Sequence, residues 1–205
     1  MLLAGGMVTL AGRLRRVPQR LGPVALALVA VALALPLGAL TSARNWVYAD
    51  EAALWQDVLA QRPHNARAHN VLAAALVQRQ GDDPQVLAQA ERHVRRALEL
   101  NPHHALAHAN LGAILLRRGD PRAALPALQE ALRLRPEHLP TRRNIALVYA
   151  GLGQWPASAQ AYEQIVQAAP DDARAWNQLG VAYAHQQRLP DAARAFAQAA
   201  RLAPD

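Results

Sequence analysis

The chain has 205 residues, of which 22 are basic, 15 are acidic and none is cysteine. The absence of cysteine excludes disulfides, thiolate nucleophiles and cysteine-based metal sites. Every basic residue is an arginine, so chemistry that depends on a lysine amine is excluded as well. The net charge of +7 is unevenly spread, because residues 1–43 hold four arginines and no acid while residues 44–205 are nearly balanced.

The N-terminal segment predicts a transmembrane helix over residues 21–43. This stretch carries no charge, and about 20 apolar residues span the hydrocarbon core of a bilayer. Four arginines lie in residues 1–20 and only Arg44 follows the stretch directly. The positive-inside rule therefore predicts a cytoplasmic Arg-rich loop and an extracytoplasmic remainder. We expect a bacterial inner-membrane protein whose C-terminal part faces the periplasm.

Two other interpretations of this segment stay open. Residues 24–35 followed by Thr41-Ser42-Ala43 are also compatible with a cleavable signal peptide. Residues 1–12 are uncharged and mostly apolar, which a signal peptide does not require, and they look like the end of a preceding membrane helix. In that case Met1 is an internal residue of a longer protein.

Beyond the membrane segment the sequence repeats with a period of 34 residues. The triplets Asn110-Leu111-Gly112, Asn144-Ile145-Ala146 and Gln178-Leu179-Gly180 recur at this interval. Further columns at the same interval hold prolines (Pro102, Pro136, Pro170, Pro204), small residues (Ala124, Ser158, Ala192) and large residues (Leu128, Tyr162, Phe196). A period of this length is typical of a stack of similar supersecondary units.

The last repeat resembles the tetratricopeptide repeat, whose pattern is W-x2-L-G-x2-Y, then a small residue, an aromatic residue and a proline. The matching residues are Trp176, Leu179, Gly180, Tyr183, Ala192, Phe196 and Pro204. The resemblance implies an all-α solenoid of helix hairpins in four repeats, at residues 66–104, 105–138, 139–172 and 173–205. Residues 44–65 are then a linking helix that caps the first repeat. The small columns should lie at close helix contacts.

A narrower resemblance concerns the junction between membrane segment and repeats. Arg44-Asn45-Trp46, Leu54-Trp55 and the stretch from Pro63 to Asn70 look like the corresponding junction in polytopic tetratricopeptide-repeat proteins of the protein O-mannosyltransferase-like class. This resemblance implies that the repeats hold acceptor proteins beside a glycosyltransferase-type membrane core. The catalytic acids of that class belong to the core, so it assigns no catalytic residue here.

Local constellations that suggest chemistry have simpler explanations. His104 and His108 share a helix face, as two metal ligands would, but no carboxylate accompanies them, and His108 takes the packing position of Trp176. Ser158 belongs to a buried column, and Asp171 and Asp172 directly precede a helix, where capping is expected. We therefore expect no metal, no cofactor and no catalytic residue.

The concave face is the candidate site. In the family it is lined by the first helix of each repeat, which selects Arg67, Asn70, Asn110, Arg117, Arg143, Asn144, Arg174, Asn177 and His185. Arginine and asparagine side chains in one groove can pair with carboxylates or peptide amides of a bound segment. A merely solvated face is the alternative. The family's lysine-based carboxylate clamp is absent because the chain has no lysine.

These observations predict a membrane-anchored scaffold that binds a protein or peptide segment. The alternative is the acceptor-binding part of a polytopic glycosyltransferase-like protein. RNA is disfavoured as a partner because the repeats are nearly neutral and few aromatic residues are available for base stacking. The sequence shows no polar capping helix after residues 191–202, which leaves two alternatives: further repeats follow, or the exposed face of this helix pairs with something, for which self-association is one candidate.

Overall fold

The computed structural model describes residues 51–203, which fold into α-helices joined by short turns. The predicted loop at residues 1–20, the predicted membrane helix at 21–43 and the first part of the linking helix lie outside the described residues. Within residues 51–203, no helix has the length and apolar composition needed to cross a bilayer.

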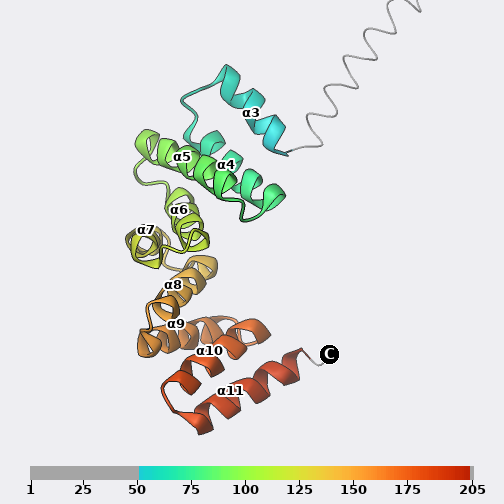
Figure 1. Cartoon of the computed structure of the whole chain (residues 1–205), viewed down its shortest axis with the longest axis vertical. Coiled ribbons are helices and arrows are strands. Elements are labelled where there is room, and N and C mark those ends of the chain that lie inside the picture. Colours follow the sequence, from blue (N-terminus) through green and yellow to red (C-terminus); the bar gives the residue numbers. More distant parts are fainter. Residues whose placement is uncertain (1–50, 204–205) are drawn as a thin grey trace, which may run out of the picture. The chain divides into compact units, whose positions relative to one another are not determined.

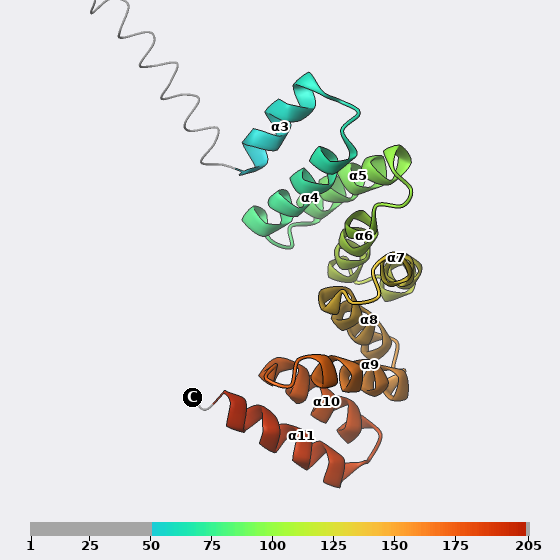
Figure 2. The ribbon, with the colours of Figure 1, turned by 180° about the vertical axis from the view of Figure 1, so that it is seen from behind.

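One helix, α3 (Glu51–Gln61), precedes four helix pairs (Figures 1 and 2). The pairs are α4 (Ala66–Gln80) with α5 (Pro84–Leu100), α6 (Ala105–Arg117) with α7 (Pro121–Leu134), α8 (Leu139–Gly151) with α9 (Trp155–Ala168), and α10 (Ala173–His185) with α11 (Leu189–Leu202). We call α4, α6, α8 and α10 the first helices and their partners the second helices. The predicted all-α solenoid of helix hairpins is confirmed.

Capping residues and left-handed turn residues set the helix boundaries. Side chains before five helices accept a hydrogen bond from a backbone N–H of the first turn; they belong to Asn65, Asp83, His104, Asp120 and Asp172. The turn inside each pair contains one residue with positive φ. It is glycine in the first three pairs (Gly81, Gly119, Gly153) and Gln187 in the last, at φ 61°. Only Gln187 therefore bears the steric cost of this conformation.

The two helices of a pair approach each other closely at small residues. Gly112 of α6 lies against Leu128 of α7, and Gly180 of α10 lies against Phe196 of α11. Ala124 and Ala192 are buried, as the periodicity predicted. The remaining member of that column, Ser158, is also buried, and its hydroxyl donates to the carbonyl of Ala146 at 2.9 Å. The polar residue in the small column is thus satisfied by the backbone it touches.

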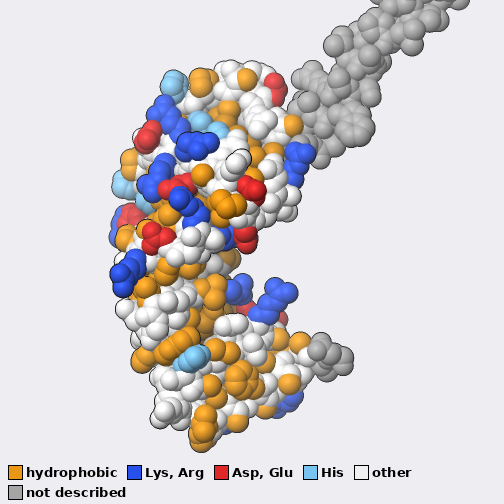
Figure 3. All heavy atoms as spheres, in the orientation of Figure 1, with side chains coloured by type: hydrophobic (Ala, Val, Ile, Leu, Met, Phe, Trp, Pro, Cys, Tyr) orange, Lys and Arg blue, Asp and Glu red, His pale blue; other side chains and the backbone are white. Residues whose placement is uncertain are grey.

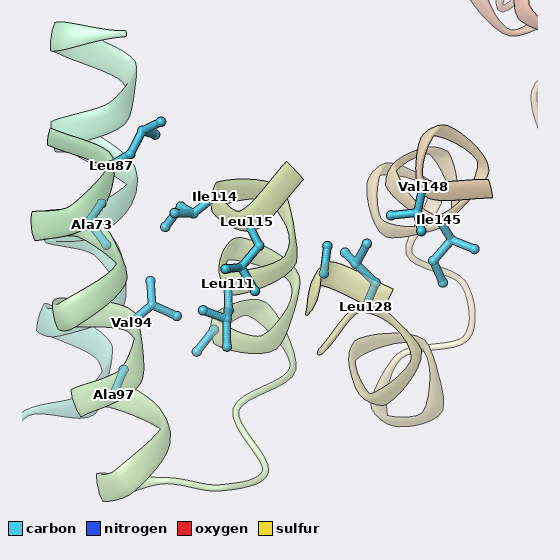
Figure 4. Packing of buried hydrophobic residues seen from close by; sticks show 13 residues of the cluster. Ala73, Leu87, Val94, Ala97, Leu111, Ile114, Leu115, Leu128, Ile145 and Val148 are labelled. Carbon is cyan, nitrogen blue, oxygen red and sulfur yellow. The ribbon is translucent and has the colours of Figure 1, made fainter. Parts of the chain in front are cut away.

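Successive pairs bury a continuous apolar core. One cluster runs from Ala73 and Leu87 of the first pair to Ile145 and Val148 of the third. Figure 4 shows Ile114 of α6 pointing towards the first pair while Leu128 of α7 lies towards α8. A second cluster joins α8 to α11 around the buried Tyr162. Each pair therefore depends on its neighbours for burial, as expected of a repeat protein.

The first helices lie on the hollowed side of the array. Figures 1 and 2 show α6 towards this side and α7 away from it. Figure 3 shows the hollow itself, bordered by arginine side chains near α10. The face presented here comes from helix positions that do not pack against the second helices.

A hydrogen bond recurs at the start of every first helix. The fourth residue of the repeat donates a side-chain N–H to the proline carbonyl that ends the preceding repeat or, for α4, follows α3. The pairs are His69 Nε2 with Pro63 O (3.1 Å), His108 Nε2 with Pro102 O (2.8 Å), Arg142 Nη2 with Pro136 O (2.7 Å) and Trp176 Nε1 with Pro170 O (2.9 Å). Three residue types thus make one contact that fixes each inter-repeat turn.

The two close-contact glycines should respond differently to alanine. A Cβ on Gly112 would lie 2.3 Å from Cγ of Leu128, which is fully buried and cannot retreat. A Cβ on Gly180 would meet the far edge of the Phe196 ring, which is 37% exposed and can shift. After the gain in helix propensity, we expect Gly112→Ala to lower the free energy of unfolding by about 1–2 kcal/mol and Gly180→Ala to change it by less than about 1 kcal/mol. Urea denaturation of both variants measures this, and equal losses would contradict the described packing.

Candidate functional site

The first helices carry a one-sided charge. Within their bounds they contain six arginines and no aspartate or glutamate. The arginines are Arg67, Arg79, Arg117, Arg142, Arg143 and Arg174. The acidic residues of the repeats lie on the second helices or in turns, so the face that the first helices present is basic.

Between α4 and α6 the predicted site residues contact one another. Asn110 donates a side-chain N–H to Oδ1 of Asn70 at 2.9 Å, and Asn70 is buried. Arg117 forms an ion pair with Asp82 at 3.0 Å, and both side chains are exposed, at 47% and 68%. Asp82 comes from the turn between α4 and α5, which at three residues is as long as the other turns inside pairs, because the five extra residues of the first repeat lengthen its two helices. That turn therefore supplies an acid that the sequence analysis did not connect with the face.

Arg143 is tied to the start of the next first helix. Its guanidinium forms an ion pair with Asp172, which also caps α10 by accepting from the N–H of Ala175. The buried Tyr162 lies close enough for the charges of Arg143 and Asp172 to act on its hydroxyl. This hydroxyl has no hydrogen-bond partner within the described residues. Burial is the main reason that its pKa is raised to about 12. The phenol is thus neutral at physiological pH.

Arg174 and Asn177 lie near the end of the described array. Both are exposed and line a hollow of about 490 Å³ together with Gln178, Phe196 and Ala199. Arg67 is exposed on α4. Burial is the main reason that the pKa of His104 is lowered, and the charge of Arg67 lowers it further. Neither Arg67 nor Arg174 has a hydrogen-bond or ion-pair partner in the part of the chain that the structure describes. Asn144 is half-buried on α8.

His185 makes a contact that its sequence position did not indicate. Its ring stacks on the indole of Trp155, with centroids 3.7 Å apart and an interplanar angle of 1°. Trp155 begins α9 and belongs to the preceding repeat. This stacking links the third and fourth pairs, so a partner would meet His185 as part of a fixed aromatic pair.

A hollow between α4 and α6 was not predicted from the sequence. It measures about 250 Å³. Ala73, Val77, Ala113 and Ile114 give it an apolar lining, and Gln78, Asn110 and Arg117 are its polar members. These residues come from both first helices, and the residue spacing within each helix matches one helix face. Sequence reasoning singled out Asn110 and Arg117 and passed over the alanines, because small apolar residues carry no chemical signal.

The side chains of His104 and His108 form structural hydrogen bonds. Nδ1 of His104 accepts from the backbone N–H of Ala107, and Nε2 of His108 donates to a carbonyl. Among residues 51–203, no group of three or more potential ligands is arranged to hold a metal ion. The pairing of His104 with His108 is therefore explained by helix capping and by the recurrent turn contact.

Another histidine pair joins α4 to α5. Nδ1 of His69 lies 3.0 Å from Nδ1 of His93, and Nε2 of His69 donates to Pro63 O. A neutral His69 must therefore accept at Nδ1, and His93 donates to it. Burial lowers the pKa of His93, and the nearby His69 and Arg92 lower it further. The folded state thus favours a neutral His93.

Comparisons with known proteins agree with this architecture. Residues 104–171 and 143–205 match family models described as tetratricopeptide repeat. The two matches together cover residues 104–205 with tetratricopeptide-repeat models, and neither match is to a catalytic family. No curated protein sequence matches the chain. The matches do not bear on the narrower resemblance to the O-mannosyltransferase-like class, which stays a prediction.

Solved structures share the fold. A crystal structure of MamA is 24% identical, with a TM-score of 0.65, over 72% of this chain and 84% of that one. A second MamA structure is 22% identical, with a TM-score of 0.66, over 83% and 90%. YrrB, described as "a TPR protein with an unusual peptide-binding site", is 22% identical, with a TM-score of 0.65, over 81% and 82%. At these identities the likeness concerns the fold.

Acid should weaken the array through His93. Its folded pKa lies below the ordinary value of 6.5, so the unfolded chain binds a proton more readily. The contribution of His93 to stability is complete above about pH 6.5 and is lost as the pH falls from there towards the folded pKa. We expect the thermal midpoint of the wild type to fall between pH 7 and pH 5 more steeply than that of His93→Gln. Parallel pH profiles would contradict this.

Proposed function

We propose that this protein is a membrane-anchored tetratricopeptide-repeat scaffold that binds a protein or peptide segment along the face of its first helices. The observation that carries the proposal is the charge of the first helices, which contain six arginines and no acid within their bounds. Two leucines on the first helices, Leu106 and Leu147, are 37% and 40% exposed. Exposed apolar residues on the same set of helices as the arginines suit a contact surface better than a solvated one.

The face offers two kinds of polar group to a partner. Arg67 and Arg174 present guanidinium groups that can pair with carboxylates in bidentate geometry. Asn144 and Asn177 present amides that can bond the backbone of an extended segment. The described contacts within the array hold other members of the face in place, so the surface is largely formed before a partner arrives.

We infer the anchor from the sequence of residues 21–43. Their uncharged, apolar composition and the four arginines before them support a helix in the bacterial inner membrane with the repeats on the periplasmic side. An anchored scaffold meets partners confined to the same surface at a raised effective concentration. Modest affinity along the face is then sufficient.

A second candidate is the acceptor-binding part of a polytopic glycosyltransferase-like membrane protein. The junction from Arg44 to Asn70 and the apolar residues 1–12 favour it. In this case the bound segment is an acceptor held for a reaction elsewhere in the protein. A reading frame upstream of Met1 that encodes further apolar helices would support this candidate over an independent scaffold.

Self-association is a further proposal for the outer side of α11. Phe196 is 37% exposed, whereas the residues at the same repeat position, Leu128 and Tyr162, are buried beneath the following pair. The outer side of α11 has the same character as those covered faces. A second copy of the chain is one occupant that would bury it.

Reversing the two unpaired arginines should weaken partner binding. We expect Arg67→Glu with Arg174→Glu to cost about 1–2 kcal/mol of binding, roughly tenfold in Kd, because two exposed attractions become repulsions. The measurement is photo-crosslinking from position 147, at the exposed Leu147, in the full chain in membranes, followed by titration of the captured partner. Arg143 is a poor choice for reversal, since its ion pair with Asp172 supports the fold.

The matched control is Arg92→Glu with Arg122→Glu, which makes the same charge change on exposed residues of α5 and α7. It should leave capture from position 147 intact. Circular dichroism of both double variants should show unchanged helicity. Full affinity in Arg67→Glu with Arg174→Glu would contradict binding along this face.

The proposed topology predicts a protease result. Protease added to intact spheroplasts should digest the repeats and spare an epitope placed at the N-terminus. Disrupted spheroplasts, in which both parts are cleaved, are the control. Protection of the repeats in intact spheroplasts would contradict the periplasmic location.

A further inference from the structure

We propose that the bound segment is acidic and that it inserts one aliphatic side chain into the hollow between α4 and α6. This inference rests on the proposed function and names the chemistry of its partner. It is carried by the shape of the hollow, the lining residues and the charge of the face around it.

The hollow suits an aliphatic side chain rather than a polar one. Its volume is about 250 Å³, against about 30 Å³ for one water molecule in the liquid. The lining contributed by Ala73, Val77, Ala113 and Ile114 offers no hydrogen bond through side chains. A polar group placed against these four residues would find no side-chain hydrogen-bond partner among them. A branched aliphatic group gains free energy in proportion to the apolar area it buries.

The polar members of the hollow can hold the backbone on either side of that group. Gln78 is exposed, and Asn110 uses one amide N–H on Asn70. An asparagine side chain has a second N–H and an acceptor oxygen, so Asn110 can still bond a passing peptide. The contact with Asn70 also fixes the orientation of the Asn110 amide. The segment is therefore held at its backbone while one side chain points into the hollow.

The charge around the hollow selects acidic neighbours for that side chain. Arg117 lines the hollow, and its ion pair with Asp82 is exposed on both sides. An exposed pair contributes little stability, so a carboxylate of the partner can replace or share Asp82 at small cost. Arg67 lies on the same helix as Ala73 and Val77 and has no partner among the described residues. A basic segment would be repelled by Arg67, whose charge no ion-pair partner offsets among the described residues.

Labelled, end-capped nonapeptides provide the test with the full chain in detergent. The first contains four glutamates around a central leucine, the second replaces the leucine by serine, and the third replaces the glutamates by lysines. We expect the leucine peptide to bind about tenfold or more tighter than the serine peptide, and the lysine peptide not to bind. Equal binding of the leucine and serine peptides, or binding of the lysine peptide, would overturn the inference.

A filling substitution locates the side chain. Ala74 lines the hollow and is exposed, so Ala74→Leu should occupy the hollow without disturbing the core. The control, Ala123→Leu, adds the same atoms at an exposed alanine of α7. We expect Ala74→Leu to reduce binding of the leucine peptide to the level of the serine peptide, with serine-peptide binding unchanged. An unaltered preference for leucine would overturn the assignment of the hollow.

Failure of this inference is distinguishable from failure of the proposed function. If the leucine and serine peptides bind equally and both are lost in Arg67→Glu with Arg174→Glu, the face binds peptides but the hollow does not select them. If a crosslinker at position 147 captures no partner and none of the peptides binds, the proposed function fails with it.

Discussion

No helix pair in this array can bury its own apolar face, and the rest of the structure follows from that constraint. Leu128 and Tyr162 are fully buried, whereas Phe196, at the same repeat position in the last described pair, stays 37% exposed, because only a following pair completes the burial of this position. The pairs must therefore stack on one another, while small residues set the close approach of the two helices inside a pair. Stacking in turn leaves one side of every first helix without helical neighbours, and this side is available to a partner.

The periodicity of the sequence contains most of this architecture. A column of small residues at an interval of 34 predicts close contacts because no other arrangement needs Ala124, Ser158 and Ala192 to be small together. The positive φ in the turn of the last pair was not predicted, because Gln187 stands where the first three pairs have a glycine. Local sequence preference fails at such a position because the repeated fold imposes the conformation on whichever residue is present.

The candidate face was predictable as a set of residues but not as a surface. Counting helix positions selects Arg117 and Arg143, yet their acidic partners, Asp82 and Asp172, come from turns 35 and 29 residues away. Only the three-dimensional structure shows which cations are engaged within the array. The hollow beside Asn110 depends on alanines, whose importance lies in the space they leave. Sequence reasoning recognises functional groups more readily than empty volume.

The hydrogen bond to the proline carbonyl shows what the fourth repeat position requires. Histidine, arginine and tryptophan differ in charge, shape and hydrophobicity, yet each places an N–H at the same carbonyl oxygen. Selection at this position can therefore act on the presence of an N–H donor that reaches the carbonyl. The rest of the side chain can then vary. Helical repeats that have lost the tryptophan can be recognised by a donor six residues after a turn proline, a rule that includes the divergent first pair.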